Sequence, residues 1–211
     1  MSSDAATERV LPDGGTRVRN PAVYTWQGSA PTTLESVRLL VTEARLRASG
    51  RLIAAADEAT GTEAFSASFE ASADRGDEAG RLLLRTTTAA QERQISLNRT
   101  EDGVWLVDHG NSSTRDEFGG SVTVDVAGAV TFNTLPIRRL GLHRTPGEFE
   151  IPVVYVTMPD LEVRLVQQTY RTVSIADDHA VIEYTQGGFT AELTVDAEGI
   201  VIDYPGVAQR L

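Results

Sequence analysis

The sequence predicts an all-β protein whose antiparallel sheet curls into a closed or incomplete barrel, with room for one short helix near residues 133–140. Apolar and polar residues alternate with a period of two in several segments, which is typical of strands that bury one face. Glycine-containing turn signals at 102–103, 186–188 and 197–199 separate such segments closely enough to indicate hairpins. Because the many short strands are not interrupted by recurring helical patterns, a large sheet that curls on itself is favoured.

The chain of 211 residues is long enough for a single domain with a sizeable core. Residues 1–20 are polar and contain Pro12 and two glycines, so we predict a disordered tail followed by one β-barrel-like domain over 21–211. The tail has no apolar core segment of the kind a leader peptide needs, and no run approaches the roughly 18 apolar residues of a membrane-spanning helix. We therefore expect a cytoplasmic protein with no transmembrane segment.

Within the domain, the alternation is clearest at 65–71, 122–126 and 189–195. In each segment the apolar residues occupy every second position and Ser, Thr, Asp or Glu lie between them, which predicts half-buried strands. Weaker signals of the same kind occur along the rest of the chain. The predicted strands lie near Tyr24, Val37, Leu46, Phe65, Leu83, Ile95, Trp105, Val124, Val153, Val166, Ile182, Leu193 and Ile200.

The stretch 32–48 also fits a helix. Thr32 and Glu35 have the spacing of a capping box, and apolar residues then recur on one helical face as far as Gly50. From these residues alone, a helix would be predicted here. The apolar residues concerned are Leu34, Val37, Val41, Ala44 and Ala48.

Composition and charge exclude several function classes. A formal charge of -11 argues against general binding to nucleic acid, whose phosphates need a dominant basic face. The absence of cysteine excludes disulfides, thiolate nucleophiles and cysteine zinc sites. All 19 basic residues are arginine, so the lysine-dependent phosphate loop is also excluded, and no dinucleotide fingerprint follows a strand. We therefore expect no cofactor.

The residues that could support catalysis are sparse. His109, His143 and His179 are far apart in the sequence and each stands beside turn-like residues, so we expect all three in surface loops. Neighbouring acids occur only at turn-like positions, which favours solvated charge over a metal site. A phosphohydrolase that binds Mg²⁺ would need acids from distant segments to converge, and this stays open as an alternative. No catalytic or metal-binding residue is predicted.

The least ordinary segment is the octapeptide 133–140, Asn-Thr-Leu-Pro-Ile-Arg-Arg-Leu. Pro136 disfavours the α conformation at Leu135, so the segment is expected to start extended or in a turn. Arg138 and Arg139 then point in different directions in either a strand or a helix, and a buried one needs a carboxylate, a phosphate or carbonyl groups. A structural ion pair with an acid such as Asp125 is one interpretation, and ligand binding is the other.

This octapeptide and the sequence after it resemble a bacterial family described as putative glycolipid-binding proteins. That family has an Asp about eight residues before the Asn, which matches Asp125 here. The resemblance continues through 153–156, 168–170 and 189–193 to the closing Tyr-Pro-Gly at 204–206. It is strong over 121–210, and in the first half chiefly Trp26 and Trp105 agree.

The resemblance implies that 32–53 forms two strands joined by a turn near Thr42-Glu43, in place of the helix. It also implies a likeness to envelope lipoprotein carriers, whose curved sheets enclose an apolar cavity. The expected function is therefore non-catalytic binding of a glycolipid or other amphiphile in a β-barrel cavity. Its acyl chains would lie inside the curl and its polar head near the octapeptide.

The candidate ligand-binding residues combine hydrogen-bonding side chains with aromatic rings that could pack against sugar faces. For each ring, ordinary core packing is the plainer interpretation. Two other functions stay open: the metal-dependent phosphohydrolase, and a structural or interaction domain with a filled core. The oligomeric state is also open. The candidates are Asn133, Arg138, Arg139, Asp125, Tyr155, Gln168, Tyr170, Tyr204 and Trp26.

Overall fold

The computed structural model describes residues 21–42, 45–59, 61–74 and 78–211. The predicted tail and Glu43 of the predicted turn lie outside the described residues. Each position at which the sequence predicts a strand lies in a strand, except Ile200, which immediately precedes one. Two further strands, 113–116 and 208–210, were not predicted.

One sheet contains all 15 strands. They are β1 (Ala22–Ser29), β2 (Thr32–Val41), β3 (Leu46–Ala54), β4 (Phe65–Asp74), β5 (Glu78–Thr87), β6 (Glu92–Arg99), β7 (Trp105–Asp108), β8 (Ser113–Asp116), β9 (Val124–Val126), β10 (Glu148–Val156), β11 (Val163–Ile175), β12 (His179–Gln186), β13 (Phe189–Asp196), β14 (Val201–Tyr204) and β15 (Ala208–Arg210).

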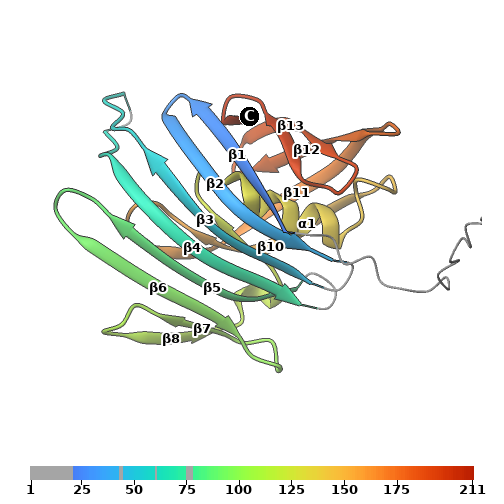
Figure 1. Cartoon of the computed structure of the whole chain (residues 1–211). Helices are drawn as coiled ribbons and strands as arrows, with labels where there is room; N and C mark the ends of the chain where they lie inside the picture. Colours follow the sequence, from blue (N-terminus) through green and yellow to red (C-terminus); the bar gives the residue numbers. More distant parts are fainter. Residues whose placement is uncertain (1–20, 43–44, 60, 75–77) are drawn as a thin grey trace, which may run out of the picture.

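The order of the strands shows how the sheet curls. It runs β8-β7-β6-β5-β4-β3-β2-β1-β15-β14-β13-β12-β11-β10-β9, so the last strand joins the first and the two halves form one surface. Figure 1 shows the first half in front of the second. All neighbours are antiparallel except β9 and β10, which makes the sheet mixed.

The sheet is not closed into a barrel by hydrogen bonds, so the closed alternative is wrong. Its free edges are β8 and β9. These edges lie in different surroundings, because β8 is exposed at all four positions whereas all three residues of β9 are buried. An incomplete curl is what the strand pairing supports.

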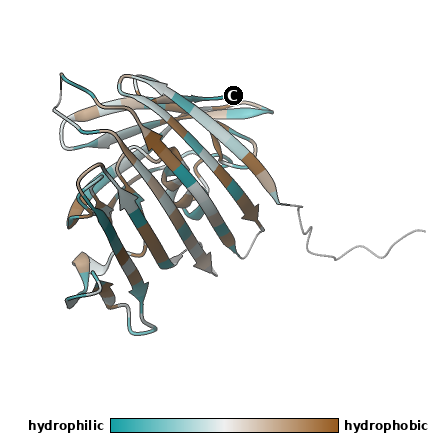
Figure 2. Cartoon of the chain, turned by 60° about the vertical axis from the view of Figure 1, so that its left-hand side comes forward, coloured by the Kyte–Doolittle hydropathy of each residue, from teal (hydrophilic) through white to brown (hydrophobic). Residues whose placement is uncertain are grey.

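The helix suggested by the capping-box spacing at 32–48 is wrong, and the two strands implied by the family resemblance are confirmed. In β2, Glu35, Val37 and Leu39 are buried while Ser36 and Arg38 are exposed, which is the pattern of a strand with one face inward. Figure 2 shows the same alternation of hydrophilic and hydrophobic bands along the strands of the first half.

The interior of the curl holds the buried part of the segment between β8 and β10. This segment contains η1 (Phe118–Gly120), η2 (Val130–Asn133) and α1 (Thr134–Arg139). Figure 1 shows α1 between the front strands and those behind. Phe132 of η2 is 1% exposed and its ring centroid lies 5.2 Å from that of Phe69 on β4. Apolar side chains of both halves and of this segment form one buried cluster.

The octapeptide forms the predicted short helix, but its start differs from expectation. Leu135 lies in the first turn of α1, so the expectation of an extended or turn conformation at this residue is wrong. Pro136 is also in the first turn, where its missing N–H group costs no intrahelical hydrogen bond. Leu135 and Ile137 are buried at 3% and 0% exposure, so packing favours the helix over the preference of a residue that precedes proline.

Candidate functional site

A buried carboxyl group, that of Asp125, lies at the centre of the candidate site. Asp125 is the middle residue of the edge strand β9 and is 7% exposed. Gln168 of β11, at 1% exposure, donates a hydrogen bond from Nε2 to Asp125 Oδ2 at 2.6 Å. The two residues are brought together by β10, which pairs with β9 on one side and with β11 on the other.

A directed chain of hydrogen bonds leads from η2 to this carboxyl group. Asn133 Nδ2 donates to the Tyr170 hydroxyl at 3.1 Å, and that hydroxyl donates to Gln168 Oε1 at 3.0 Å. Gln168 and Tyr170 are two residues apart on β11 and therefore share one face of the sheet. Burial raises the pKa of Tyr170 well above its ordinary value, so this phenol stays a protonated donor.

The next strand, β12, adds Tyr184 and Gln186. Gln168 Nε2 lies 3.1 Å from the Tyr184 hydroxyl and 2.7 Å from Gln186 Oε1, in addition to Asp125. The amide has only two hydrogens for these three acceptors, so at least one acceptor is left for another donor. Tyr184 itself donates to Gln186 Oε1 at 2.8 Å. We call these six residues the Asp125 network: Asp125, Asn133, Gln168, Tyr170, Tyr184 and Gln186.

Three aromatic residues border the network. Tyr155 of β10 is half-buried and lies opposite Asp125 in the parallel pairing of β10 with β9. The guanidinium carbon of Arg164 lies over the Tyr155 ring, 5.2 Å from its centroid. Phe189 pairs with Gln186 across the β12–β13 hairpin and is 47% exposed. The Tyr204 ring lies 6.3 Å from that of Phe189. We call Tyr155, Phe189 and Tyr204 the aromatic rim, because Phe189 and Tyr155 bring the buried network to the surface.

Burial also decides the charge of the site. It raises the pKa of Asp125 from 3.8 to about 6, against the opposing effects of the Gln168 hydrogen bond and of the Val126 backbone. The carboxyl group can therefore be protonated or charged near neutral pH, and it can either donate a hydrogen bond or accept several. A group of this kind, surrounded by amides and phenols, suits a ligand rich in hydroxyl groups.

A second buried carboxyl group holds the other side of η2. Glu35 of β2 is 1% exposed and accepts hydrogen bonds from the backbone N–H groups of Val130 at 2.6 Å and Thr131 at 3.3 Å. Burial raises its pKa to about 7, and the charge of Asp125 adds to this rise. The segment that supplies Asn133 is thus positioned between two buried acids.

The structure brings six of the nine predicted site residues together and leaves three elsewhere. Asp125, Asn133, Gln168 and Tyr170 belong to the network, and Tyr155 and Tyr204 to the rim. Trp26 is fully buried and donates from Nε1 to the Val201 carbonyl at 2.9 Å, a contact between β1 and β14. Arg138 and Arg139 lie at the end of α1, where Arg138 donates hydrogen bonds to backbone carbonyl groups.

Arg138 has a structural role in these contacts. Its guanidinium donates to the Glu198 carbonyl at 2.5 Å and to the Thr42 carbonyl at 3.3 Å, joining α1 to two loops of the sheet. We expect Arg138→Ala to lower the free energy of unfolding by about 2 kcal/mol, the usual loss for charged hydrogen bonds that are partly buried. Urea unfolding measures this, and Arg138→Lys should lose less because one donor remains.

Exposed Arg144 supplies the control for that experiment, since Arg144→Ala removes the same charge. An Arg138→Ala variant as stable as Arg144→Ala would show that the carbonyl contacts do not support the fold.

His143 differs from expectation, because it is buried at 6% exposure and not in a surface loop. Burial first, and then the neighbouring Arg144 and Arg138, lower its pKa to about 4, so the ring is neutral near neutral pH. His109 is exposed and His179 is half-buried at the start of β12. Among the described residues, no three His, Asp or Glu side chains converge so that they could hold a metal ion.

Sequence reasoning missed Glu35, Tyr184's partner Gln186, and Phe189 of the rim. A signal was present for each. Glu35 shares the period of Val37 and Leu39, and an acid on an apolar face is a candidate as soon as the segment is read as a strand. Gln186 and Phe189 flank the Gly187-Gly188 turn, and this hairpin pairs them directly, so their side chains lie on the same face of the sheet.

The chain is similar to a known protein family. A family model described as "Putative glycolipid-binding" matches residues 23–210. The structure is similar to the crystal structure of a DUF1089 family protein from Pseudomonas aeruginosa, with a TM-score of 0.66, 27% identity, and coverage of 97% of this chain and 100% of that one. No curated protein matches the sequence.

A more distant likeness concerns the fold alone. A β-barrel-like protein of the domain of unknown function DUF1849 from Brucella abortus has a TM-score of 0.54 and 11% identity, over 93% of this chain and 95% of that one. Within the described ranges, no helix is long and apolar enough to span a membrane.

Proposed function

This chain belongs to the putative glycolipid-binding family, and from that premise we propose that it binds the sugar head of a glycolipid at the Asp125 network without catalysis. The observation that carries the proposal is the cluster of carboxyl, amide and phenol groups around Gln168, beside the exposed ring of Phe189. Gln168 Nε2 and the Tyr184 hydroxyl together supply the hydrogens for Asp125, Tyr184 and Gln186. The carboxyl and amide oxygens keep further lone pairs, to which hydroxyl groups of a ligand can donate. Sugars supply such donors.

The aromatic rim supports the same ligand class. Sugar rings present apolar C–H faces as well as hydroxyl groups, and aromatic side chains with polar neighbours suit both. Phe189 offers an exposed ring beside Gln186, and Tyr155 offers a half-buried ring beside Asp125. A sugar placed there would meet a ring and a hydrogen-bonding group on the same strand pair.

The acyl chains of the ligand need a place other than the centre of the curl. That centre is filled by η2 and α1, with Phe132 packed on Phe69. In our proposal the head enters the network from the rim and the chains pass outward over Phe189 and Tyr204. In this proposal the interior serves stability, and the Asp125 network with the aromatic rim serves binding.

Octyl β-glucoside, used below its micelle concentration, is the probe that tests this proposal. We expect it to raise the midpoint of thermal unfolding, because it binds the folded state only. The octyl ether of tetraethylene glycol has the same alkyl chain without a sugar and should have little effect. Equal shifts with the two detergents would contradict a sugar site.

Gln186→Ala is the informative variant, because Gln186 is half-buried and its loss should leave a folded protein. We expect roughly five- to tenfold weaker binding of octyl β-glucoside, the value of one hydrogen bond. Isothermal titration calorimetry measures this, and Gln167→Ala is the matched control, since Gln167 lies on β11 but faces solvent. If both variants bind like the wild type, the network is not the site.

A further inference from the structure

The outer face of strands β2 to β5 carries a concentration of positive charge. Five arginines point outward from these strands and are exposed, and we call them the arginine face. Glu70 is the one acid among the outward-facing side chains that the structure describes on these strands. This face stands out because the whole chain has a formal charge of -11. The five residues are Arg38, Arg47, Arg51, Arg81 and Arg85.

No other described residue neutralises the arginine face. Ion pairs occur elsewhere, for example between Arg210 and Asp196 at 2.7 Å and between Arg171 and Glu183 at 2.9 Å. The five arginines form no ion pair or hydrogen bond with a described residue, and no described element lies over their side of the sheet in Figure 1. Their guanidinium groups are therefore free to bind anions.

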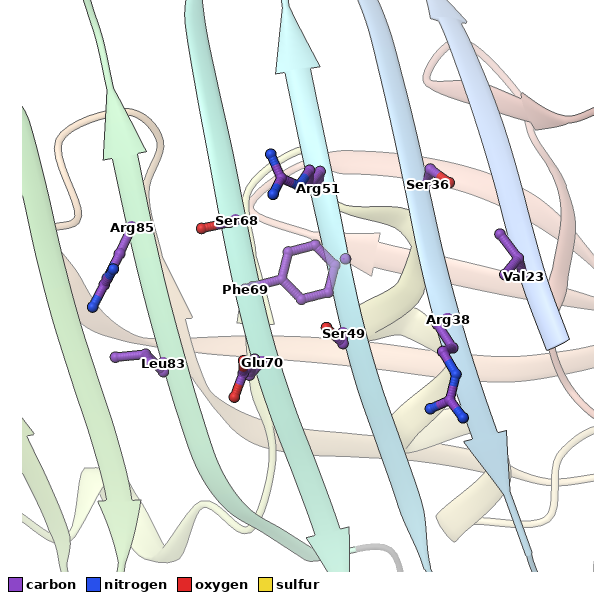
Figure 3. A pocket seen from close by; sticks show the side chains of 11 residues that line it. Val23, Ser36, Arg38, Ser49, Arg51, Ser68, Phe69, Glu70, Leu83 and Arg85 are labelled. Carbon is purple, nitrogen blue, oxygen red and sulfur yellow. The ribbon is translucent and has the colours of Figure 1, made fainter. Parts of the chain in front are cut away.

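Serines separate the arginines and open hollows between them. Arg51 stands opposite Ser36 on one neighbouring strand and Ser68 on the other, and Ser68 in turn stands opposite Arg85. The short serine side chains leave a hollow of about 530 Å³, which is bordered by Arg38, Arg51 and Arg85. Figure 3 shows these three arginines on three different strands with serines between them.

Exposed aliphatic residues occupy the same side of the sheet. Val23, Leu34 and Ile53 are 68%, 42% and 54% exposed. Leu34 and Ile53 are direct cross-strand partners and border a second hollow with Gln27. None of these three is aromatic, and recognition of single-stranded nucleic acid relies on aromatic stacking. Guanidinium groups beside exposed aliphatic side chains instead match a lipid surface, whose phosphates lie just outside an apolar layer.

We propose that the arginine face docks the protein onto a membrane surface rich in anionic phospholipids. The guanidinium groups bind lipid phosphates, and Leu34 and Ile53 enter the boundary between headgroups and acyl chains. Repulsion from the acidic remainder of the chain is limited, because physiological salt screens charges beyond about 8 Å. This docking goes beyond the proposed sugar site and does not depend on it.

Flotation with phospholipid vesicles that contain no glycolipid tests the proposal. We expect binding to vesicles of phosphatidylcholine with phosphatidylglycerol, weak binding to phosphatidylcholine alone, and loss of binding at high salt. Each arginine near an anionic surface contributes roughly fivefold in affinity, so Arg51→Gln/Arg85→Gln should bind about 30-fold more weakly. Circular dichroism should show an unchanged fold, since both side chains are exposed and form no ion pair with a described residue.

Two further variants make the result specific. Arg115→Gln/Arg144→Gln removes the same charge from exposed positions elsewhere and should bind like the wild type. Leu34→Ser/Ile53→Ser should weaken binding while keeping the preference for anionic vesicles. Equal losses in the two arginine double variants would overturn the proposal, and so would binding to a DNA duplex without binding to vesicles. Gln186→Ala should bind vesicles normally, which separates this test from that of the sugar site.

Discussion

The protein should become less stable as the pH rises from about 4 to about 8, because two buried carboxyl groups lose their protons over this range. Burial raises the pKa of Asp125 from 3.8 to about 6 and that of Glu35 from 4.5 to about 7. A folded-state pKa above the unfolded value means that the folded state holds the proton more tightly. The stabilisation is complete below the unfolded pKa and is lost as the pH rises through the folded pKa.

The size of the expected fall in the free energy of unfolding follows from the shifts in pKa. A rise of about two pKa units corresponds to roughly 3 kcal/mol for each carboxyl group. His143 opposes them, because its lowered pKa adds roughly 3 kcal/mol of stability as the pH rises from about 4 to 6.5, so the net fall is roughly 3 kcal/mol. Urea unfolding at several pH values measures it. In Asp125→Asn and in Glu35→Gln, we expect most of the net fall to disappear, because the remaining carboxyl group and His143 then have opposite effects of similar size.

The slope with pH is the quantity to compare, since either substitution also disturbs hydrogen bonds at every pH. Glu192→Gln, at an exposed position of β13, changes the net charge by the same amount and should keep the full slope. A flat wild-type profile would mean that water or a conformational change solvates these carboxyl groups. The surroundings of Asp125 and Glu35 would then be more hydrated than their burial in the structure indicates.

Phe132→Ala should lower the free energy of unfolding by about 4 kcal/mol, the usual cost of a large cavity in a core. Phe132 is 1% exposed, and it anchors η2 against Phe69 with the ring centroids 5.2 Å apart. Urea unfolding again provides the measurement. The double variant with Phe69→Ala should be more stable than the sum of the single effects predicts, by about 1 kcal/mol, because the aromatic contact is lost only once.

Phe149→Ala is the control for this prediction. Phe149 is 42% exposed on β10, and its loss should cost less than about 1 kcal/mol. The same variants also locate the ligand. If the alkyl chain binds at the rim, Phe132→Ala should bind octyl β-glucoside as the wild type does, whereas a clear gain in affinity would place the chain inside the curl.

Much of the fold could be predicted because alternation is a local property. Each strand shows in its own residues which positions face inward, so the all-β class and the strand positions follow from short segments. The stretch 32–48 was ambiguous, because its apolar residues satisfy a helical period as well. Packing of Glu35, Val37 and Leu39 on one side of the sheet resolves it, and that packing involves residues about a hundred positions away.

The candidate site, like the fold, could be predicted from the sequence only in part. Gln168 and Tyr170 are two positions apart, so a common face could be predicted for them from the strand period. Their meeting with Asp125 depends on the parallel pairing of β9 with β10, which the all-antiparallel prediction does not contain. Arg138 shows the converse, because its conspicuous place after Pro136 suggested a ligand and its guanidinium binds carbonyl groups of the framework.

By itself, the sequence determined which side of each strand is buried, where the short helix lies, and which residues can form hydrogen bonds or present charge. Only the tertiary structure decided that the sheet stays open, that a helical segment fills it, and that arginines from separate strands form one face. The physical reason is the distance along the sequence over which each feature is set. The alternation of side chains is set within a few residues, whereas strand register and neighbours are set by contacts between distant segments, whose free energies no short stretch reveals.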